Sequence, residues 1–427
     1  MRKLPIVPAS FDKIVGGGQA LATLENGKKL FAWGGLPDEK VTVQVTKKKS
    51  NLVEGIVTEV LKASNDRIEP RDPESYVSTS PWQIMTMEAE QRYKAALIIE
   101  AFQLHSVVLP HAVEVYTDGR AFEYRNKIEF SFWFETDTQK LSLAFFRRGT
   151  HGKISVQGTS LAAPAINEKA QAVLAVLNDM QVVGRALKTL LIRSNANGEV
   201  NWQLYVKDPE FEHEDFMSRF DEGEKGQVIF SNPLSPASVV TEYLTPHVVR
   251  LTDTILGIPF SYATEGFFQI NLPVYEQALH DMKAYIPEDK PVLDLYSGVG
   301  TIGLTIGGND LTLVELNKDA VREMKNNIAE LGKKATAVLA ASEDVTEYIT
   351  SDKVVILDPP RAGLHSNVID RLLEVTPSRI VYLSCNPVTQ ARDVALLAEK
   401  YDIVAHKGYN FFPRTPHIEN LVVLDLR

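Results

Sequence analysis

The chain has almost no cysteine: Cys385 is the only one in 427 residues. One cysteine cannot form an intramolecular disulfide, and it cannot supply the three or four thiolates of an iron–sulfur cluster or a cysteine-based zinc site. We therefore expect no metal site. The lone thiol lies in "RIVYLSCNPVTQARDV", where an apolar run of β-forming residues ends and a turn begins.

Long apolar runs and an excess of positive charge are also missing. No uninterrupted apolar run approaches the ~20 residues that a membrane span needs. The N-terminal stretch "MRKLPIVPASFDKIVGGGQA" has no apolar segment long enough for a secretory signal, so we expect a cytoplasmic protein with no membrane partner. The net charge is -10, so any contact with nucleic acid must rely on local groups of Lys and Arg.

The length and the sequence pattern divide the chain into three parts. At roughly 150 residues per domain, the length favours two or three domains. Residues 1–64 contain short alternating segments separated by turn signals such as Asn26-Gly27, which predicts a small OB-like β-barrel of a kind that often binds nucleic acid. Residues 65–271 mix helical and alternating segments, which predicts a central α+β domain.

Residues 272–427 alternate between helical and apolar patterns. The buried-strand candidates are "PVLDLY", "LTLVEL", "ATAVLA", "KVVILD" and "RIVYLS", followed by "DIVAHKGYNF" and "NLVVLDLR". Helical segments such as "NKDAVREMKNNIAELG" separate the first five. This alternation predicts an α/β fold with a parallel, Rossmann-like sheet and helices on both of its faces.

A glycine-rich turn follows the first of these strands, in "DLYSGVGTIGLTI". Gly298 and Gly300 would let the backbone approach a ligand closely, at the edge where open α/β sheets bind cofactors. Glu315 ends the next strand about 20 residues on, where an acid accepts hydrogen bonds from ribose hydroxyls. The spacing is D-x-x-x-G-x-G and a P-loop lysine is absent, which favours S-adenosylmethionine over NAD or a nucleotide triphosphate. Simple turn glycines are the alternative.

Four motifs in this order and spacing resemble those of the RNA uracil-5 methyltransferases: "DLYSGVGTIGL", "DPPRAGL", "LSCNP" and "HIEN". "YATEGFFQIN" and "YRNK" resemble further motifs of the family, and the first part resembles a TRAM domain, an RNA-binding barrel that opens many ribosomal-RNA members. The resemblance covers nearly the whole chain. It implies a class I methyltransferase domain that uses S-adenosylmethionine to make 5-methyluridine in ribosomal RNA or tRNA.

Carried over residue by residue, the resemblance implies the chemistry of single side chains. Cys385 would be the nucleophile that adds to carbon 6 of uracil, and Glu419 the base that removes the proton from carbon 5. Arg361 would lie at the floor of the active site or near a substrate phosphate. The residues expected to bind S-adenosylmethionine are Gln269, Tyr296, Gly298, Gly300, Thr301, Glu315 and Asp358.

One departure from the family concerns a [4Fe–4S] cluster that many TRAM-bearing members hold on four cysteines. The corresponding segments "RDPESYVSTSPWQ" and "VQGTSLAAP" have no cysteine, so we expect no iron–sulfur cluster. For the same reason, the RNA target of cluster-bearing relatives is not carried over to this chain. Ribosomal RNA of the 23S type is the leading target, and the T-loop uridine of tRNA is the alternative. A non-catalytic RNA-binding factor and a small-molecule methyltransferase are the other readings; a monomer is compatible with the sequence.

Side chains that could contact RNA fall into two groups. An RNA base must leave its stack to meet the thiol, so aromatic side chains near the site are candidates for stacking. Phenylalanines that could stack are Phe267, Phe268, Phe411 and Phe412, although core packing is an equally good reading of each. Candidate phosphate contacts on the central domain are Arg125, Lys127, Arg147 and Arg148.

Overall fold

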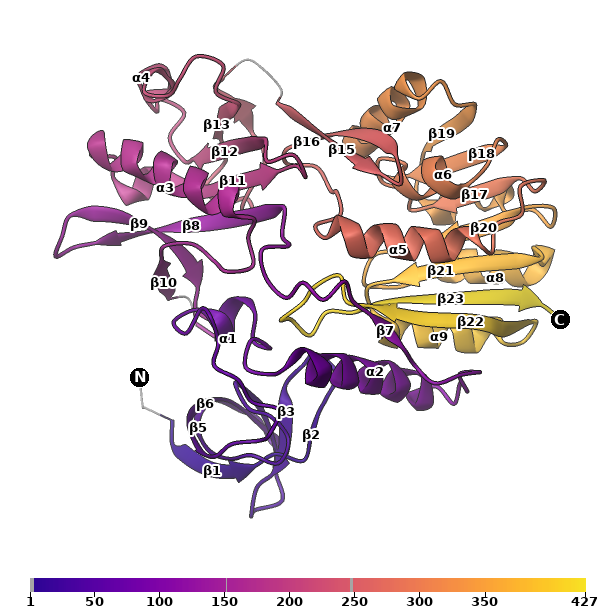
Figure 1. The fold of residues 1–427 in the computed structure, drawn as a ribbon, viewed down its shortest axis with the longest axis horizontal. Coiled ribbons are helices and arrows are strands. Elements are labelled where there is room, and N and C mark those ends of the chain that lie inside the picture. Colours follow the sequence, from indigo (N-terminus) through magenta and orange to yellow (C-terminus); the bar gives the residue numbers. More distant parts are fainter. Residues whose placement is uncertain (1–3, 151, 246–248) are drawn as a thin grey trace.

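The structure is a computed structural model that describes residues 4–150, 152–245 and 249–427. The described chain forms sheets of six, seven, two and eight strands. Figure 1 shows three lobes: the six-stranded sheet at the N-terminus, the seven-stranded sheet beside it, and the eight-stranded sheet with its helices. No helix in the described ranges is long and apolar enough to cross a membrane.

The N-terminal lobe is a curved sheet with the strand order β1-β5-β6-β4-β3-β2. The hairpin expected at Asn26-Gly27 joins β3 to β4, and Gly27 has the positive φ of 78° that such a turn requires. The strands are β1 (Ile6–Ser10), β2 (Lys13–Ile14), β3 (Ala20–Thr23), β4 (Lys29–Trp33), β5 (Lys40–Lys48) and β6 (Leu52–Lys62).

The central lobe is built on the strand order β10-β9-β8-β11-β12-β13-β14. Helix α3 (Pro164–Asp179) packs on this sheet, and Trp202 and Phe216 lie in its apolar core. The hairpin of β15 (Arg250–Ile255) and β16 (Ile258–Ala263) leads on to the C-terminal lobe. The remaining elements are β8 (Lys127–Glu135), β9 (Lys140–Phe146), β10 (Lys153–Val156), β11 (Leu187–Ser194), β12 (Val200–Val206), α4 (His213–Ser218), β13 (Gly226–Phe230) and β14 (Glu242–Tyr243).

The C-terminal lobe has the α/β architecture that the sequence pattern predicts. Its sheet has the order β19-β18-β17-β20-β21-β23-β22-β7; the first five strands are parallel, and β23 runs antiparallel to both neighbours. All seven buried-strand candidates form strands. They are β17 (Val292–Leu295), β18 (Leu311–Glu315), β19 (Ala335–Leu339), β20 (Val354–Leu357), β21 (Arg379–Ser384), β22 (Tyr401–Tyr409) and β23 (Glu419–Leu426).

Helices cover both faces of this sheet because successive strand residues point to opposite sides. In β20, Val355 and Leu357 face one apolar cluster, whereas Val354 and Ile356 face the other. The first cluster includes side chains of α8 and α9, and the second includes those of α5, α6 and α7. The helices are α5 (Leu272–Lys283), α6 (Thr301–Ile306), α7 (Lys318–Glu330), α8 (Ser366–Val375) and α9 (Pro387–Leu397).

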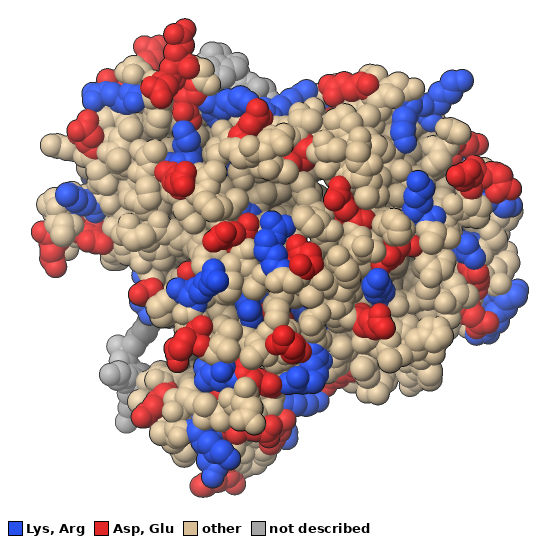
Figure 2. Space-filling view, viewed as in Figure 1, with Lys and Arg blue, Asp and Glu red and all other residues tan. Residues whose placement is uncertain are grey.

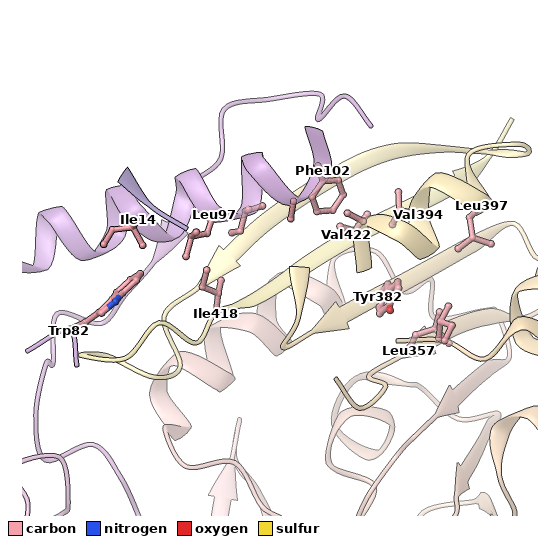
Figure 3. Packing of buried hydrophobic residues seen from close by; sticks show 14 of the residues in the cluster. Ile14, Trp82, Leu97, Phe102, Leu357, Tyr382, Val394, Leu397, Ile418 and Val422 are labelled. Carbon is pink, nitrogen blue, oxygen red and sulfur yellow. The ribbon is translucent and has the colours of Figure 1, made fainter. Parts of the chain in front are cut away.

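Two elements from residues 65–271 belong spatially to the C-terminal lobe. Strand β7 (Val115–Tyr116) pairs with the outer strand β22, and helix α2 (Met87–Leu104) packs against α9. In Figure 3, Leu97 and Phe102 of α2 lie over Val394 and Val422. Burial of each such side chain contributes roughly 1.5–3 kcal/mol.

The same apolar cluster reaches into the N-terminal lobe. Ile14 of β2 and Trp82, which precedes α2, lie near Ile418 at the start of β23 in Figure 3. Trp82 also donates its indole N–H to the carbonyl of Gly18, at 3.0 Å. The short helix α1 (Tyr76–Thr79) lies in this connection between the lobes. The N-terminal sheet is thus fixed beside the end of the C-terminal sheet that carries Cys385.

Candidate active site

A cavity of about 760 Å³ lies at the carboxyl ends of the parallel strands, where doubly wound sheets bind their ligands. We call it the main cavity. All expected site residues except Gly300 line it: Gln269, Tyr296, Gly298, Thr301, Glu315, Asp358, Cys385 and Glu419. Gly298 and Gly300 both have a left-handed backbone, with φ of 56° and 89°, but their surroundings differ. A Cβ at Gly300 would lie 2.9 Å from Leu304 Cδ1, so close packing also requires glycine at this position.

The turn after β17 holds its shape through Glu315. The carboxylate of Glu315 accepts hydrogen bonds from the backbone N–H of Gly298, at 2.9 Å, and of Asn317, at 2.7 Å. A Cβ at Gly298 would meet no atom within 4 Å, so bare backbone faces open space there. Tyr296 has a φ of 63°, which is rare for a side chain of this size and marks a constrained turn at the cavity.

Asp294 supports this turn from behind. Its buried Oδ2 accepts a hydrogen bond from the N–H of Gly303 in α6, at 2.9 Å, while its Oδ1 has no partner among the described residues. Burial raises the pKa of Asp294 well above its ordinary value. Thr301, at the start of α6, is held by the phenol of Tyr275, whose oxygen lies 2.8 Å from the threonine hydroxyl. Asp294 therefore positions α6 and does not line the main cavity.

Strand pairing brings Cys385 and Glu419 to the same edge of the sheet. The antiparallel register of β21 and β23 pairs Ser384, the last residue of β21, with Asn420. Cys385 follows Ser384 directly, and Glu419 begins β23, so both lie at this end of the strand pair. Asn386 connects this edge to the Asp-Pro-Pro-Arg loop, because its amide donates to the carbonyl of Arg361, at 2.9 Å. The Asn386 side-chain oxygen also caps helix α9, which begins with Pro387.

The main cavity contains two buried carboxyl groups beside the thiol. Burial raises the pKa of Asp358 to about 7. Burial, followed by the charge of Asp358, raises the pKa of Glu419 well above its ordinary value. Burial, the charge of Glu419 and the charge of Asp358 raise the pKa of Cys385 to about 11. The two carboxyl groups therefore do not readily ionise together, and the thiol is protonated at neutral pH.

His417 is a neutral residue that accepts a hydrogen bond. The Arg361 guanidinium donates to His417 Nδ1 at 3.1 Å, and because a guanidinium has no acceptor, Nδ1 must be the unprotonated nitrogen. Burial, followed by the positive charge of Arg361, lowers the pKa of His417 to about 4. His417 therefore does not act as a second proton-accepting base alongside Glu419 at neutral pH while it keeps this bond.

The "YRNK" motif supports the site from the central lobe. Asn126 donates to the carbonyl of Gln269, at 2.9 Å, and Tyr124 donates to the carbonyl of Pro413, at 2.9 Å. Lys127 donates to the carbonyl of Glu265, at 3.2 Å, and burial lowers its pKa to about 8. Lys127 therefore points inward and not, as we had expected, toward a phosphate. Its ammonium group instead binds the loop at Glu265, which lines the main cavity.

A buried polar network, which we did not predict, holds the loop before Glu419. Glu90 of α2 accepts hydrogen bonds from Asn410 Nδ2, at 2.8 Å, and from the backbone N–H of Arg414, at 3.0 Å. Lys94 lies 3.0 Å from Glu90 and donates to Asn410 Oδ1, at 2.5 Å. The signal in the sequence was an acid and a base four residues apart on the buried side of an apolar helix.

The aromatic candidates divide between core and cavity. Phe268 stacks on Tyr262 with ring centroids 3.9 Å apart, and Phe411 is buried. Phe267 is 71% exposed at the main cavity, and Phe412 lines the same cavity against the His417 ring. Phe267 and Phe412 thus keep surfaces that a base could meet. In the described ranges, no group of three His, Cys, Asp or Glu side chains could hold a metal ion.

A parallel sheet with a glycine turn, an acid at the end of the second strand and an open carboxyl edge defines a class I methyltransferase. The chain belongs to the tRNA (uracil-5-)-methyltransferase family, whose model matches residues 92–427. It is therefore an RNA methyltransferase that uses S-adenosylmethionine.

Whole-length relatives agree with this assignment. An uncharacterized RNA methyltransferase of Enterococcus faecalis is 28% identical, and the match covers 92% of each chain. One of Lactobacillus johnsonii is also 28% identical, over 100% of this chain and 99% of that one. The crystal structure of the Pyrococcus abyssi tRNA (uracil-54, C5)-methyltransferase in complex with S-adenosyl-L-homocysteine has the same fold, with a TM-score of 0.79 at 20% identity over 98% of this chain and 100% of that one.

Proposed function

We propose that this enzyme methylates carbon 5 of a uridine in ribosomal RNA of the 23S type through a covalent bond between Cys385 and the uracil. The observation that carries the proposal is that Cys385, directly after β21, and Glu419, at the start of the adjacent β23, line one cavity. The N-terminal sheet would act as a TRAM-like RNA-binding barrel (residues 1–64), and residues 65–271 would form a second RNA-binding part before the catalytic residues 272–427.

The main cavity fits S-adenosylmethionine in size and in chemistry. Its volume of about 760 Å³ lies within the roughly 300–1,000 Å³ of small-molecule sites. Glu315 offers a carboxylate for ribose hydroxyls, and Gly298 offers bare backbone. Bound there, the cofactor supplies an electrophilic methyl group on a sulfonium. Further residues that would hold it are Gln269, Tyr296, Thr301 and Asp358.

The thiol and the carboxyl pair account for the proton transfers of the reaction. As Cys385 sulfur bonds to carbon 6, its proton passes to the ionised carboxylate of the pair, and the electrons of the C5–C6 double bond move toward carbon 5 and its carbonyl. Carbon 5 would then take the methyl group as the methyl–sulfonium bond breaks. The proton from the thiol passes from the carboxyl pair to solvent, so that Glu419 can remove the proton left on carbon 5. The double bond then returns, and sulfur leaves carbon 6 and takes a proton back. A carboxylate of raised pKa suits this step, because a general base is most effective when its pKa lies near the operating pH. Such a base typically contributes ~10²–10⁴-fold to the rate.

The T-loop uridine of tRNA is the second candidate target. The Pyrococcus abyssi structure is titled as a tRNA enzyme, and the match extends over the N-terminal sheet of this chain. An N-terminal sheet of this kind therefore does not by itself favour ribosomal RNA. Mapping of 5-methyluridine in total RNA from a deletion strain separates the two: loss from 23S ribosomal RNA supports the proposal, and loss from the T-loop of tRNA supports the alternative.

A trapping experiment tests the chemistry. RNA that contains 5-fluorouridine should form a lasting covalent complex with the wild type and S-adenosylmethionine, because fluorine at carbon 5 cannot leave as a proton. Cys385→Ala should form none. Glu419→Gln should trap a methylated complex even with ordinary uridine RNA, because the proton on carbon 5 then has no base to receive it. Equal complex formation by the wild type and Cys385→Ala on a denaturing gel would show that the proposed nucleophile is wrong.

A further inference from the structure

A second cavity meets the thiol from the side of the N-terminal lobe. We call this cavity of about 340 Å³ the junction cavity, because its walls come from all three lobes. Gly16, Gly17 and Trp33 belong to the N-terminal sheet region, and Arg148 belongs to the central lobe. The junction cavity shares Cys385, Arg361 and His417 with the main cavity, so the sulfur lies where the two adjoin.

The junction cavity carries positive charge without matching acids. Arg148 donates to the backbone carbonyls of Val77, at 2.5 Å, and Ser78, at 3.2 Å. Arg361 donates to a neutral histidine. Among the described residues, neither guanidinium has a carboxylate within ion-pair distance, whereas most buried charges are paired. Arg361 also acts electrostatically on Glu419 in the main cavity. Two guanidinium groups without an ion-pair partner at one small cavity suit an anion, and guanidinium matches phosphate in shape and charge.

The junction cavity also carries an aromatic surface. The Arg148 guanidinium lies 4.1 Å from the centre of the Trp33 ring, which fixes the half-buried indole. The indole N–H of Trp33 makes no hydrogen bond to the described residues and remains a free donor. Beside it, a Cβ at Gly16 or Gly17 would meet nothing within 4 Å, so a planar ligand can approach the backbone closely. An aromatic face with a cation is the usual platform for an RNA base.

We propose that the junction cavity binds the nucleotide that adjoins the target uridine in the RNA chain, with its base against Trp33 and its phosphodiester against Arg148 and Arg361. This inference rests on the proposed function, because it places the target uracil at Cys385. One phosphodiester joins consecutive nucleotides, so a uracil held in the main cavity brings its neighbour to the adjoining one. A volume of about 340 Å³ lies at the lower end of the roughly 300–1,000 Å³ of ligand sites, which is enough for one base and too small for a helix.

This arrangement gives the N-terminal lobe a defined part in substrate choice. Trp33 is the last residue of β4 in the N-terminal lobe. The apolar cluster of Ile14, Trp82 and Ile418 fixes the N-terminal lobe against the C-terminal lobe. The enzyme would then select a pair of unstacked nucleotides instead of a single flipped uridine. In duplex RNA both bases remain stacked, so neither the main cavity nor the junction cavity could bind its base.

The test combines a change in the enzyme with a change in the RNA. The substrate is a synthetic RNA that contains the mapped target uridine, compared with versions that lack the base of the 5′ or 3′ neighbour. Trp33→Leu keeps apolar volume and removes the ring; Trp133→Leu, at an exposed tryptophan of β8 outside both cavities, is the matched control. We expect Trp33→Leu to lower kcat/KM about 5- to 150-fold, as for lost base stacking, and Trp133→Leu to leave it unchanged.

The two changes should not add. Removing the neighbouring base should lower kcat/KM of the wild type by a similar factor but have little further effect on Trp33→Leu, because the contact is already gone. Equal losses in both enzymes would overturn the inference while leaving methylation itself intact; failure of the wild type to methylate any RNA would instead contradict the proposed function.

A crosslinking measurement on the wild type covers the case in which Trp33→Leu does not fold. A 4-thiouridine at the neighbouring position should crosslink to the peptide that contains Trp33. Crosslinks confined to peptides outside the junction cavity would also overturn the proposal.

Discussion

At the scale of single residues, Cys385 lies in an environment that suppresses its thiolate. Reactive cysteines usually lie near positive charge that lowers their pKa. Here burial raises the pKa of Cys385 to about 11, the neighbouring acids Glu419 and Asp358 add to the rise, and Arg361 opposes it. The thiol is therefore protonated at neutral pH, and in the proposed mechanism it would react only as its proton passes to a neighbouring carboxylate.

This environment predicts slow alkylation of the thiol. Iodoacetamide should modify Cys385 about tenfold faster for each pH unit between pH 7 and 10, because the thiolate fraction rises in proportion below the pKa. Asp358→Asn removes a negative charge that destabilises the thiolate, so the pKa should fall and alkylation at pH 8 should accelerate several-fold. Arg361→Gln removes a stabilising positive charge and should slow it. Mass spectrometry follows the reaction without ambiguity, because no other cysteine is present.

Asp402→Asn is the control for this prediction, since Asp402 forms an exposed ion pair with Arg427 far from the cavity residues. It should leave the rate unchanged. A thiol that alkylates at its full rate at pH 7 would contradict the electrostatic account, and so would a slower reaction in Asp358→Asn than in the wild type.

At the scale of elements, helix α2 carries the loop that presents Glu419. Its Glu90 and Lys94 are completely buried and bind the segment from Asn410 to Arg414. Glu90→Gln leaves Lys94 and Arg414 in the interior without a countercharge, so we expect the free energy of unfolding to fall by about 3–5 kcal/mol. Urea denaturation measures that change, and kcat should fall with it because the loop before the base is released.

The same helix provides the control. Glu100 forms an exposed pair with Lys13 at 2.6 Å, so Glu100→Gln should change the free energy of unfolding by less than about 1 kcal/mol. The double variant Glu90→Gln with Lys94→Met should recover part of the loss, because it removes both buried charges. Equal effects of Glu90→Gln and Glu100→Gln would mean that the buried network does not hold the loop.

The elements also show what the sequence could predict. Strands β17, β18, β20 and β21 were visible as short apolar runs, because the inner strands of a parallel sheet covered on both faces bury most of their residues. Cys385, Asp358 and Glu315 follow or end such strands, so their meeting at one edge could be foreseen. Helix α2 and strand β7 could not be assigned to this lobe, since their position depends on pairing and packing partners about 290 residues away in the chain.

The contacts of single side chains were harder to predict from the sequence than the sheet edge at which the site lies. We expected Lys127 to contact phosphate because it is a cation at the start of a strand in the central lobe. In the structure its ammonium group is largely buried and donates to the carbonyl of Glu265. Gly300 shares a motif and a left-handed backbone with Gly298, and only the nearby Leu304 side chain separates their surroundings. The junction cavity has no sequence signal at all, because three lobes form it.

At the scale of the whole molecule, charge limits how RNA can be held. The net charge is -10, and Figure 2 shows acidic and basic side chains interspersed over the viewed face without a continuous basic area. Arg148 and Arg361 line the junction cavity at Cys385 without an ion pair to a described carboxylate, and the exposed Arg147 precedes Arg148 in the chain. Affinity must therefore come from a few phosphate contacts together with base contacts in the two cavities.

This balance predicts a weak dependence of RNA binding on salt. About three phosphate contacts to a single strand give a slope of about -2 in a plot of log K against log salt, so affinity should fall about 20-fold between 50 and 200 mM KCl. Proteins with 6–10 contacts lose ~10³–10⁵-fold over the same range. Fluorescence anisotropy with the target RNA measures the slope, and Arg147→Ala should reduce its size by about 0.7. Lys290→Ala should not, because this exposed lysine precedes β17 and lies at the end of the sheet opposite to Cys385. A slope steeper than -6 would mean that a broad basic surface, and not the cavities at Cys385, holds the RNA.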